Sequence, residues 1–236
     1  MKIGIISDVH GNDIALKTVI DDLKKESIDG IIYLGDLIAG GPNPKNTLDI
    51  LKQQNIVGWV KGNTDCKYEE VLKNKNHYEL QEYYLYALQE LSYEDLEYLT
   101  NKPKQEIITI EGFDILCLHG SPRNIMEKMG IEVDKDKLLK MIEGVNANII
   151  LCGHSHFPSI VELDDKVIVN AGSVGFPIDG DNRASYVILD INENGYSFDF
   201  KRIEYNIEII INDARIKRLP ELEEYVETIK KAISLE

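Results

Sequence analysis

The chain has 236 residues, of which 43% are hydrophobic and 28% are charged, so it can form one large domain and is too apolar for a disordered chain. Its 26 basic and 41 acidic residues give a formal net charge of −15, which disfavours nucleic acid as a partner because an acidic surface repels phosphate. No apolar run approaches the roughly 20 residues of a membrane-spanning helix, so no membrane partner is expected.

Residues 2–65 alternate between apolar runs and amphipathic segments. Strands are expected at residues 2–7, 30–34 and 56–60, and helices at residues 12–25 and 44–54. The apolar runs are typical of buried strands, and the helical segments carry apolar side chains at helical spacing. This β-α-β-α-β order predicts parallel strands joined by right-handed crossovers.

A polar segment at residues 66–103 interrupts the alternation. We expect two or three helices ending at Pro103, with Ser92 and Asp95 forming a capping box for the last helix. The segment is either a cap over a site or ordinary outer packing, and we expect no function for its His77. Its tyrosines either pack its own core or border a site and stack nucleobases. They are Tyr68, Tyr78, Tyr83, Tyr84, Tyr86, Tyr93 and Tyr98.

After Pro103 the pattern is mainly that of strands. Strands are expected at residues 105–110, 113–118, 148–152, 158–163, 166–170, 184–191 and 196–203, and helices near 134–144 and from Pro220 to Ile233. There is no internal repeat and no linker. We therefore predict a single α/β (α+β) domain over residues 1–236, built on two sheets, with a helical insertion at about 66–103.

Five predicted strands each end in residues that can bind a metal, usually beside a glycine. These residues are Asp8 and His10, Asp36, Asn63, His119, and His154 with His156. Sites in α/β sheets form at the carboxyl ends of strands, where the loops converge. In an extended chain the i, i+2 spacing of Asp8 with His10, and of His154 with His156, directs both side chains the same way. Seven donors exceed the four ligands of one tetrahedral zinc ion and suit two ions roughly 3.5–4 Å apart.

The ordered set Asp8-x-His10, Gly35-Asp36, Gly62-Asn63, His119 and Gly153-His154-x-His156 resembles the calcineurin-like metallophosphoesterase superfamily. The resemblance extends over residues 1 to about 203. The run from Asn170 to Gly175 and the run from Arg183 to Tyr186 resemble its small bacterial and archaeal branch, which includes phosphodiesterases and diadenosine-tetraphosphate hydrolases. The resemblance implies a four-layer α-β-β-α sandwich with two mixed sheets.

The same resemblance implies two divalent metal ions. One ion would be held by Asp8, His10 and His156, the other by Asn63, His119 and His154, with Asp36 bridging. Asp36, Asn63 and His119 would then form the catalytic centre. Mixed imidazole and carboxylate ligands admit manganese, iron, cobalt, nickel and zinc, and we expect manganese.

The resemblance implies an enzyme that hydrolyses phosphodiester or phosphoanhydride bonds through a metal-bridging hydroxide. The expected partner is a small phosphorylated substrate, with nucleotides such as diadenosine tetraphosphate as candidates. Two alternatives stay open: a phosphomonoesterase or protein phosphatase, and a non-catalytic metal-binding module of the same fold.

Several polar residues near these motifs are candidates for supporting roles. Asn12 is a candidate both for donating to a phosphate oxygen and for capping the first helix, and the two roles are compatible. Arg183 is expected to contact phosphate, and Arg123 is either a second phosphate contact or a surface arginine. Asp65 is expected to support a metal-bound histidine. Many members of the family carry histidine where Thr64 stands, so no histidine general acid is expected there.

The amino terminus and the cysteines favour a cytoplasmic protein. Residues 1–8 run directly into a strand-like segment without a small-residue cleavage site, so we do not expect a signal peptide. Cys66, Cys117 and Cys152 are odd in number and include no C-x-x-C pair, which argues against a disulfide framework.

Overall fold

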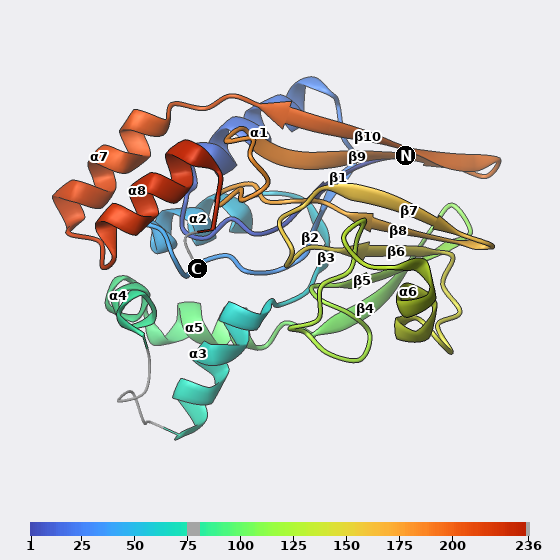
Figure 1. Ribbon diagram of the computed structural model, residues 1–236, viewed down its shortest axis with the longest axis horizontal. Coiled ribbons are helices and arrows are strands. Elements are labelled where there is room, and N and C mark those ends of the chain that lie inside the picture. The colour runs from blue at the N-terminus through green and yellow to red at the C-terminus, as the bar shows by residue number, and fades with distance from the viewer. Residues whose placement is uncertain (75–80, 235–236) are drawn as a thin grey trace.

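The computed structural model describes residues 1–74 and 81–234, and two five-stranded sheets lie at its centre (Figure 1). The first sheet has the order β10-β9-β1-β2-β3, with β10 (Gly195–Ile203), β9 (Ala184–Asn192), β1 (Lys2–Ile6), β2 (Gly30–Tyr33) and β3 (Ile56–Trp59). The second has the order β4-β5-β6-β8-β7, with β4 (Gln105–Ile110), β5 (Phe113–Leu118), β6 (Ile149–Cys152), β8 (Lys166–Asn170) and β7 (Ser159–Leu163).

Both sheets are mixed. In the first sheet β1, β2 and β3 run parallel, and β9 and β10 extend it with antiparallel pairs. In the second sheet β5, β6 and β8 run parallel, and the edge strands β4 and β7 pair antiparallel. The parallel strands of the first sheet are connected by α1 (Asp13–Lys25) and α2 (Pro44–Lys52), which confirms the predicted β-α-β-α-β order.

Alternation along the strands divides the core into layers. Ile3 and Ile5 of β1 lie fully buried between the two sheets, with Ile149 and Leu151 of β6 in the same cluster. Ile6 of β1 belongs instead to the cluster under the helices. Because successive side chains of a strand point to opposite faces, one strand contributes to both cores.

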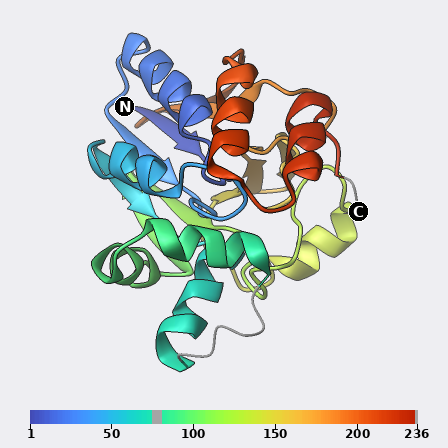
Figure 2. The ribbon, with the colours of Figure 1, turned by 90° about the vertical axis from the view of Figure 1, so that its left-hand side faces the viewer.

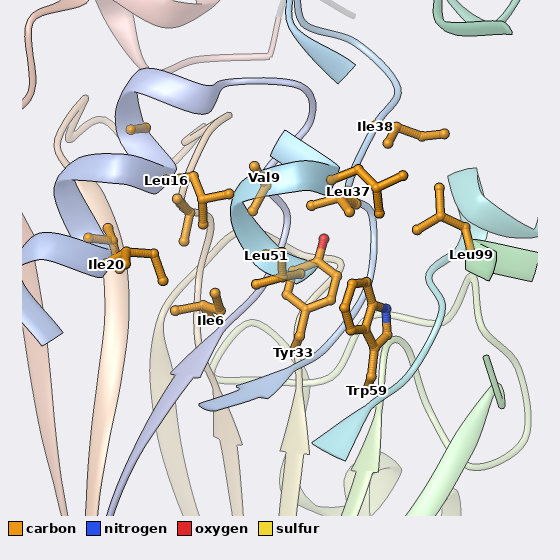
Figure 3. Close-up of a cluster of buried hydrophobic side chains, with 14 of the residues drawn as sticks. Ile6, Val9, Leu16, Ile20, Tyr33, Leu37, Ile38, Leu51, Trp59 and Leu99 are labelled. Carbon is orange, nitrogen blue, oxygen red and sulfur yellow. The ribbon is translucent and has the colours of Figure 1, made fainter. Parts of the chain in front are cut away.

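The first sheet is covered on its outer face by α1, α2 and part of the helical segment that follows β3. Figure 3 shows Leu16 and Ile20 of α1 on one side of this cluster, and Tyr33 with Trp59 on the other. The Tyr33 and Trp59 rings meet edge to face with centroids 5.3 Å apart. Such aromatic pairs contribute about 0.5–1.5 kcal/mol beyond the area that they bury.

The second sheet is covered on its outer face by the short helix α6 (Lys135–Met141). Leu138 and Met141 of this helix pack against Leu116 and Ile150 of the sheet. The layers therefore follow the order helices, sheet, sheet, helix, which confirms the four-layer sandwich that the resemblance implies.

The tyrosine-rich segment contains three helices in its described part: α3 (Asn63–Asn74), α4 (Glu82–Glu90) and α5 (Tyr93–Thr100). The predicted capping box is present, because Ser92 and Asp95 each accept from the other's backbone N–H. Tyr68 and Tyr84 are buried in the core cluster of the first sheet, so these two tyrosines pack the interior. His77 and Tyr78 lie outside the described residues.

One helix was absent from the sequence prediction: α7 (Ile207–Lys217), which precedes α8 (Leu222–Lys231). Its Ile-Glu-Ile-Ile-Ile start is typical of a strand, because β-branched residues favour extended chain. Ile210 and Ile211 instead pack with Tyr225 and Ile229 of α8. Figure 2 shows the two helices side by side, across this end of the molecule from α3–α5. Packing against α8 therefore overrides the local preference.

No described helix combines the length and the apolar composition that crossing a lipid bilayer requires.

Replacement of Asp95 by asparagine tests the attachment of α5 to α2. Asp95 is almost buried and lies 2.9 Å from Nζ of Lys52 and 3.3 Å from Nζ of Lys45. Burial would raise its pKa, but Lys52, Ser92 and Lys45 together lower the pKa to about 2. We expect Asp95→Asn to reduce the free energy of unfolding at pH 7 by about 1–2 kcal/mol in urea denaturation.

The pH dependence has a definite sign. A carboxylate whose folded pKa lies near 2 and whose unfolded pKa is about 3.9 stabilises fully above the unfolded value. The difference between wild type and Asp95→Asn should therefore be constant above about pH 5 and shrink from about pH 4 towards pH 2. Asp49→Asn, which removes only an exposed partner of Lys45, is the control and should cost well under about 1 kcal/mol. Equal effects of the two variants would contradict this interpretation.

Candidate metal centre

Loops after the strands carry most of the predicted metal ligands in an unusual backbone conformation. Asp8, His10, Asp36, His154 and His156 all have φ between 48° and 65°, in the left-handed region. A non-glycine residue pays roughly 1–2 kcal/mol for that conformation. The extended-chain argument for the i, i+2 pairs was therefore wrong in its geometry. Tight left-handed turns, and not strand alternation, direct these side chains inward.

Backbone hydrogen bonds hold two of these loops together beyond the ends of β1 and β2. The N–H of Asp8 donates to Gly35 O at 2.9 Å, and the N–H of His10 donates to Asp36 O at 3.1 Å. Gly62 lies against the same turn, where a Cβ would overlap Oδ1 of Asp36. Glycine is thus required at position 62 for close approach of the chain.

Three histidines are oriented by backbone carbonyls. Nδ1 of His10 lies 2.7 Å from Ala39 O, and Nδ1 of His119 lies 2.8 Å from Leu34 O. Nδ1 of His156 lies 2.5 Å from the carbonyl of Phe176. Because a carbonyl can only accept, each Nδ1 donates, and each neutral ring then presents a lone pair on Nε2.

These Nε2 atoms converge on the oxygens of two buried carboxylates. Oδ1 of Asp8 lies 3.1 Å from His156 Nε2, 3.7 Å from His10 Nε2 and 3.9 Å from His119 Nε2. Oδ2 of Asp36 lies 3.3 Å from His119 Nε2 and 3.9 Å from His10 Nε2. The second oxygen of each carboxylate is anchored elsewhere, to the N–H of His154 for Asp8 and to Thr64 for Asp36.

The electrostatics keep both carboxylates ionised. Burial would raise the pKa of Asp36, but His119 and His10 hold it at about 2. The pKa of Asp8 is likewise well below its usual range, because His156 and His119 outweigh the effect of burial. Conversely, burial would lower the pKa of His119, and the two carboxylates raise it to about 10. The cluster therefore attracts a positive charge strongly.

These residues fit divalent metal ions. Oδ1 of Asp8 is buried and has no hydrogen-bond partner among the residues that the structure describes. The Nε2 atoms of His10 and His156 are only 3.3 Å apart although both rings donate through Nδ1. When the three rings are neutral, the inward atoms are all acceptors, and such a cluster is costly in a protein interior unless cations, either protons or metal ions, occupy it.

The potential ligand atoms form two overlapping triads. One contains Asp8, His10 and His156, and the other contains Asp8, Asp36 and His119. Oδ1 of Asn63, the first residue of α3, lies 2.9 Å from His119 Nε2 and so faces the second triad. Asp8 is shared between the triads, whereas the resemblance gave the bridging position to Asp36 alone.

His154 lies outside both triads. Its Nε2 is 3.0 Å from the carbonyl of Met126, to which it donates, so Nδ1 is its free acceptor. Its ring centroid is 5.2 Å from that of His119. His154 is therefore a neighbour of the second triad, and its main contact is through its backbone N–H to Asp8.

Thr64 and Asp65 position the Asp36 loop. The N–H and the hydroxyl of Thr64 donate to Oδ1 of Asp36 at 2.9 and 2.8 Å. Oδ2 of Asp65 accepts from the N–H groups of Asp36 and Gly62, both at 2.9 Å. Asp65 thus supports a carboxylate loop, and not a histidine as the sequence suggested.

The side chains predicted to contact phosphate are engaged with protein groups in this structure. The Nδ2 group of Asn12 donates to Gly175 O and to the hydroxyl of Tyr205, and its Oδ1 caps α1, which confirms the predicted capping role. Arg183 is half-exposed and pairs with Asp181 two residues away. Arg123 pairs with Glu127 on the surface.

No sequence pattern indicates the carbonyls that orient the histidines. Leu34, Ala39, Met126 and Phe176 act through backbone oxygens, which every residue type possesses. Phe176 also packs its ring against His10, with centroids 5.5 Å apart.

Comparison with known proteins supports the same chemistry. The profile of the calcineurin-like phosphoesterase superfamily domain matches residues 1–194. An uncharacterized protein of Methanocaldococcus jannaschii is 30% identical over 93% of this chain and 94% of its own length. A phosphodiesterase of the same organism is 22% identical over 73% of this chain and 83% of its own. A crystal structure of a metallophosphoesterase from Sphaerobacter thermophilus is 28% identical, covers 99% of both chains and superposes with a TM-score of 0.82.

Removal of the Thr64 hydroxyl should weaken metal binding. Thr64→Val keeps the shape of the side chain but leaves Oδ1 of Asp36 with only the backbone N–H. Loss of a group that orients a ligand typically costs 10–100-fold in metal affinity, so we expect about a ten-fold higher dissociation constant for Mn²⁺ by calorimetry. Thr64→Ser retains the hydroxyl and should stay within about three-fold of wild type. Indistinguishable affinities of the valine and serine variants would contradict this role.

Proposed function

The chain belongs to the calcineurin-like phosphoesterase superfamily, and on that premise we propose that it is a metal-dependent hydrolase of phosphodiesters. The observation that carries the proposal is the buried convergence of two carboxylates and the Nε2 atoms of three imidazoles on one point. Buried ionic clusters often contribute no more to stability than apolar residues of similar volume, so this cluster points to a role in binding cations.

We assign one ion to Asp8, His10 and His156 and the other to Asp36, Asn63 and His119, with His154 beside the second ion. When bound, two divalent ions would supply positive charge for the phosphoryl group and would acidify water for attack on phosphorus. That local charge also offsets the repulsion between an anionic substrate and a protein of net charge −15.

The protein's own residues contribute fixed orientation. The carbonyls of Leu34, Ala39 and Phe176 fix three imidazole rings, and Thr64 fixes Asp36. Preorganised groups need no rearrangement when charge develops in the transition state, and this is commonly the largest contribution to catalysis.

None of the side-chain contacts described above leaves a proton free for donation to the leaving group. In the neutral rings of His10, His119, His154 and His156, each ring N–H group donates to a backbone carbonyl. The Thr64 hydroxyl donates to Asp36. This favours substrates whose leaving group departs without a proton, and it disfavours the alternatives of a phosphomonoesterase or protein phosphatase acting on alkyl esters.

We further propose manganese as the physiological metal and the cytoplasm as the location. Imidazole and carboxylate donors together accept Mn²⁺, and its availability favours it over metals that bind more tightly. All three cysteines are free thiols, consistent with a reducing compartment. A nucleotide substrate such as diadenosine tetraphosphate stays a prediction of the sequence.

The assignment of Asp36 predicts a severe effect of an isosteric change. Asp36→Asn would replace the acceptor Oδ2 by an NH₂ group that donates to the imidazoles of His119 and His10. We expect kcat/KM for bis(4-nitrophenyl) phosphate with Mn²⁺ to fall at least about 10³-fold, with loss of bound metal.

Two further substitutions serve as controls for Asp36→Asn. Arg183→Ala, at a half-exposed residue paired with Asp181, should change kcat/KM by less than about three-fold. Asn12→Ala removes a helix cap and should act mainly on stability, by about 1 kcal/mol. Full metal content and a near-wild-type rate in Asp36→Asn would refute the assignment. Normal metal content without turnover of any phosphoester by the wild type would instead support the non-catalytic alternative.

Because these imidazole and hydroxyl protons already donate to protein acceptors, we predict that the rate of hydrolysis depends steeply on the pKa of the leaving group. General acid catalysis is typically worth about 10²–10⁴-fold, and an enzyme without it loses this factor only for poor leaving groups. In a series of methyl aryl phosphodiesters, kcat/KM should fall steeply as the pKa of the phenol rises, and dialkyl diesters should be barely hydrolysed. A dialkyl diester cleaved as fast as the nitrophenyl diester would show that another group donates the proton.

A further inference from the structure

A cavity of about 260 Å³ opens beside the candidate metal centre. His10 and Thr64 line its inner end, and Phe176 forms part of its wall. Its outer part is lined by Tyr83 at the start of α4 and by residues at the start of α8. A substrate whose phosphate reaches the metal ligands would therefore place a neighbouring group in this cavity.

Aromatic rings connect the two ends of the cavity. Phe176 lies 5.5 Å from His10 and 6.1 Å from Tyr225 of α8, measured between ring centroids. Tyr83 lines the cavity as well and is partly exposed. Of the tyrosines in the helical segment that the structure describes, it is the one that borders this space.

The outer part of the cavity is acidic. Glu221 and Glu224 line it, and neither forms an ion pair with a described residue. By contrast, Glu227 on the next turn of α8 pairs with Lys231. The cavity's described lining contains no lysine and no arginine. Any group entering from the metal centre thus meets aromatic side chains and then uncompensated negative charge.

We propose that this cavity selects phosphodiesters whose non-reacting arm ends in a cationic ammonium group. The proposal rests on the proposed function and names a substrate class for it. Aromatic faces and carboxylates together attract quaternary and primary ammonium groups. A polyphosphate chain would instead bring further negative charges against Glu221 and Glu224 with no basic side chain to hold them. The negative charge of the cavity therefore disfavours diadenosine tetraphosphate as a substrate.

An isosteric pair of substrates isolates the charge of the arm. One ester is 4-nitrophenyl phosphocholine, and the other carries a 3,3-dimethylbutyl arm, in which carbon replaces the ammonium nitrogen. Both release 4-nitrophenolate, so the chemistry at phosphorus is the same. We expect the Mn²⁺-loaded wild type to favour the choline ester about ten-fold in kcat/KM at low ionic strength, and this ratio should fall as salt is added.

Variants of α8 locate the source of the preference. In the double variant Glu221→Gln/Glu224→Gln the ratio should fall to about two-fold, with the change mainly in KM. Glu223→Gln is the matched control, because Glu223 is exposed in the first turn of α8 but does not line the cavity. It should keep the wild-type ratio. Thermal melting of all three proteins checks that loss of carboxylates at the helix start has not unfolded α8.

Each outcome decides a different question. Equal rates for the two esters in the wild type, or a preference that survives the double variant, would overturn the cavity assignment and leave the phosphodiesterase intact. If neither ester and no other phosphoester is hydrolysed with metal bound, the proposed function fails. Calorimetric binding of the two esters then still tests the cavity, because equal affinities would overturn it and a choline preference lost in the double variant would support it.

Discussion

A surplus of hydrogen-bond acceptors at one buried point is the constraint on which the rest of this structure depends. Oδ1 of Asp8, Oδ2 of Asp36 and the Nε2 atoms of three histidines each lie within 4 Å of at least one other of these atoms, and all are acceptors when the rings are neutral. The surrounding contacts all preserve that surplus. Backbone carbonyls accept from the Nδ1–H groups, and the Thr64 hydroxyl donates to Oδ1 of Asp36. The inward atoms, Nε2 of the histidines and Oδ2 of Asp36, therefore stay available for cations.

The four-layer sandwich stabilises the strained backbone of the loops that carry the candidate ligands. Five candidate ligands hold a left-handed backbone that costs roughly 1–2 kcal/mol each, and such strain persists only where the surroundings determine it fully. Here the two sheets bury a continuous apolar layer, and the loops after β1 and β2 stay paired through the N–H groups of Asp8 and His10. Burial of the sheets thus holds the loops in a geometry that they would not adopt alone.

The metal centre and the acidic part of the proposed cavity are formed by different parts of the chain. The superfamily profile ends at residue 194, and every candidate ligand lies before that point. The α7–α8 pair follows it and supplies Glu221, Glu224 and Tyr225 to the cavity wall. The candidate metal ligands therefore lie in the part of the chain that the superfamily profile matches, whereas the proposed choice of substrate depends on the helices that follow.

From the sequence alone, the strands, the first two helices and the set of residues with metal-binding side chains could be recognised, because apolar periodicity and ligand chemistry are local properties. The capping box at Ser92 and Asp95 is equally local. Tertiary structure decided the remainder. Packing against α8 turned the isoleucines of α7 into a helix, and contacts across the chain engaged Asn12 with Gly175 and Tyr205. Backbone carbonyls determine the histidine tautomers, and because every residue type has the same carbonyl, the sequence does not reveal which ones do so.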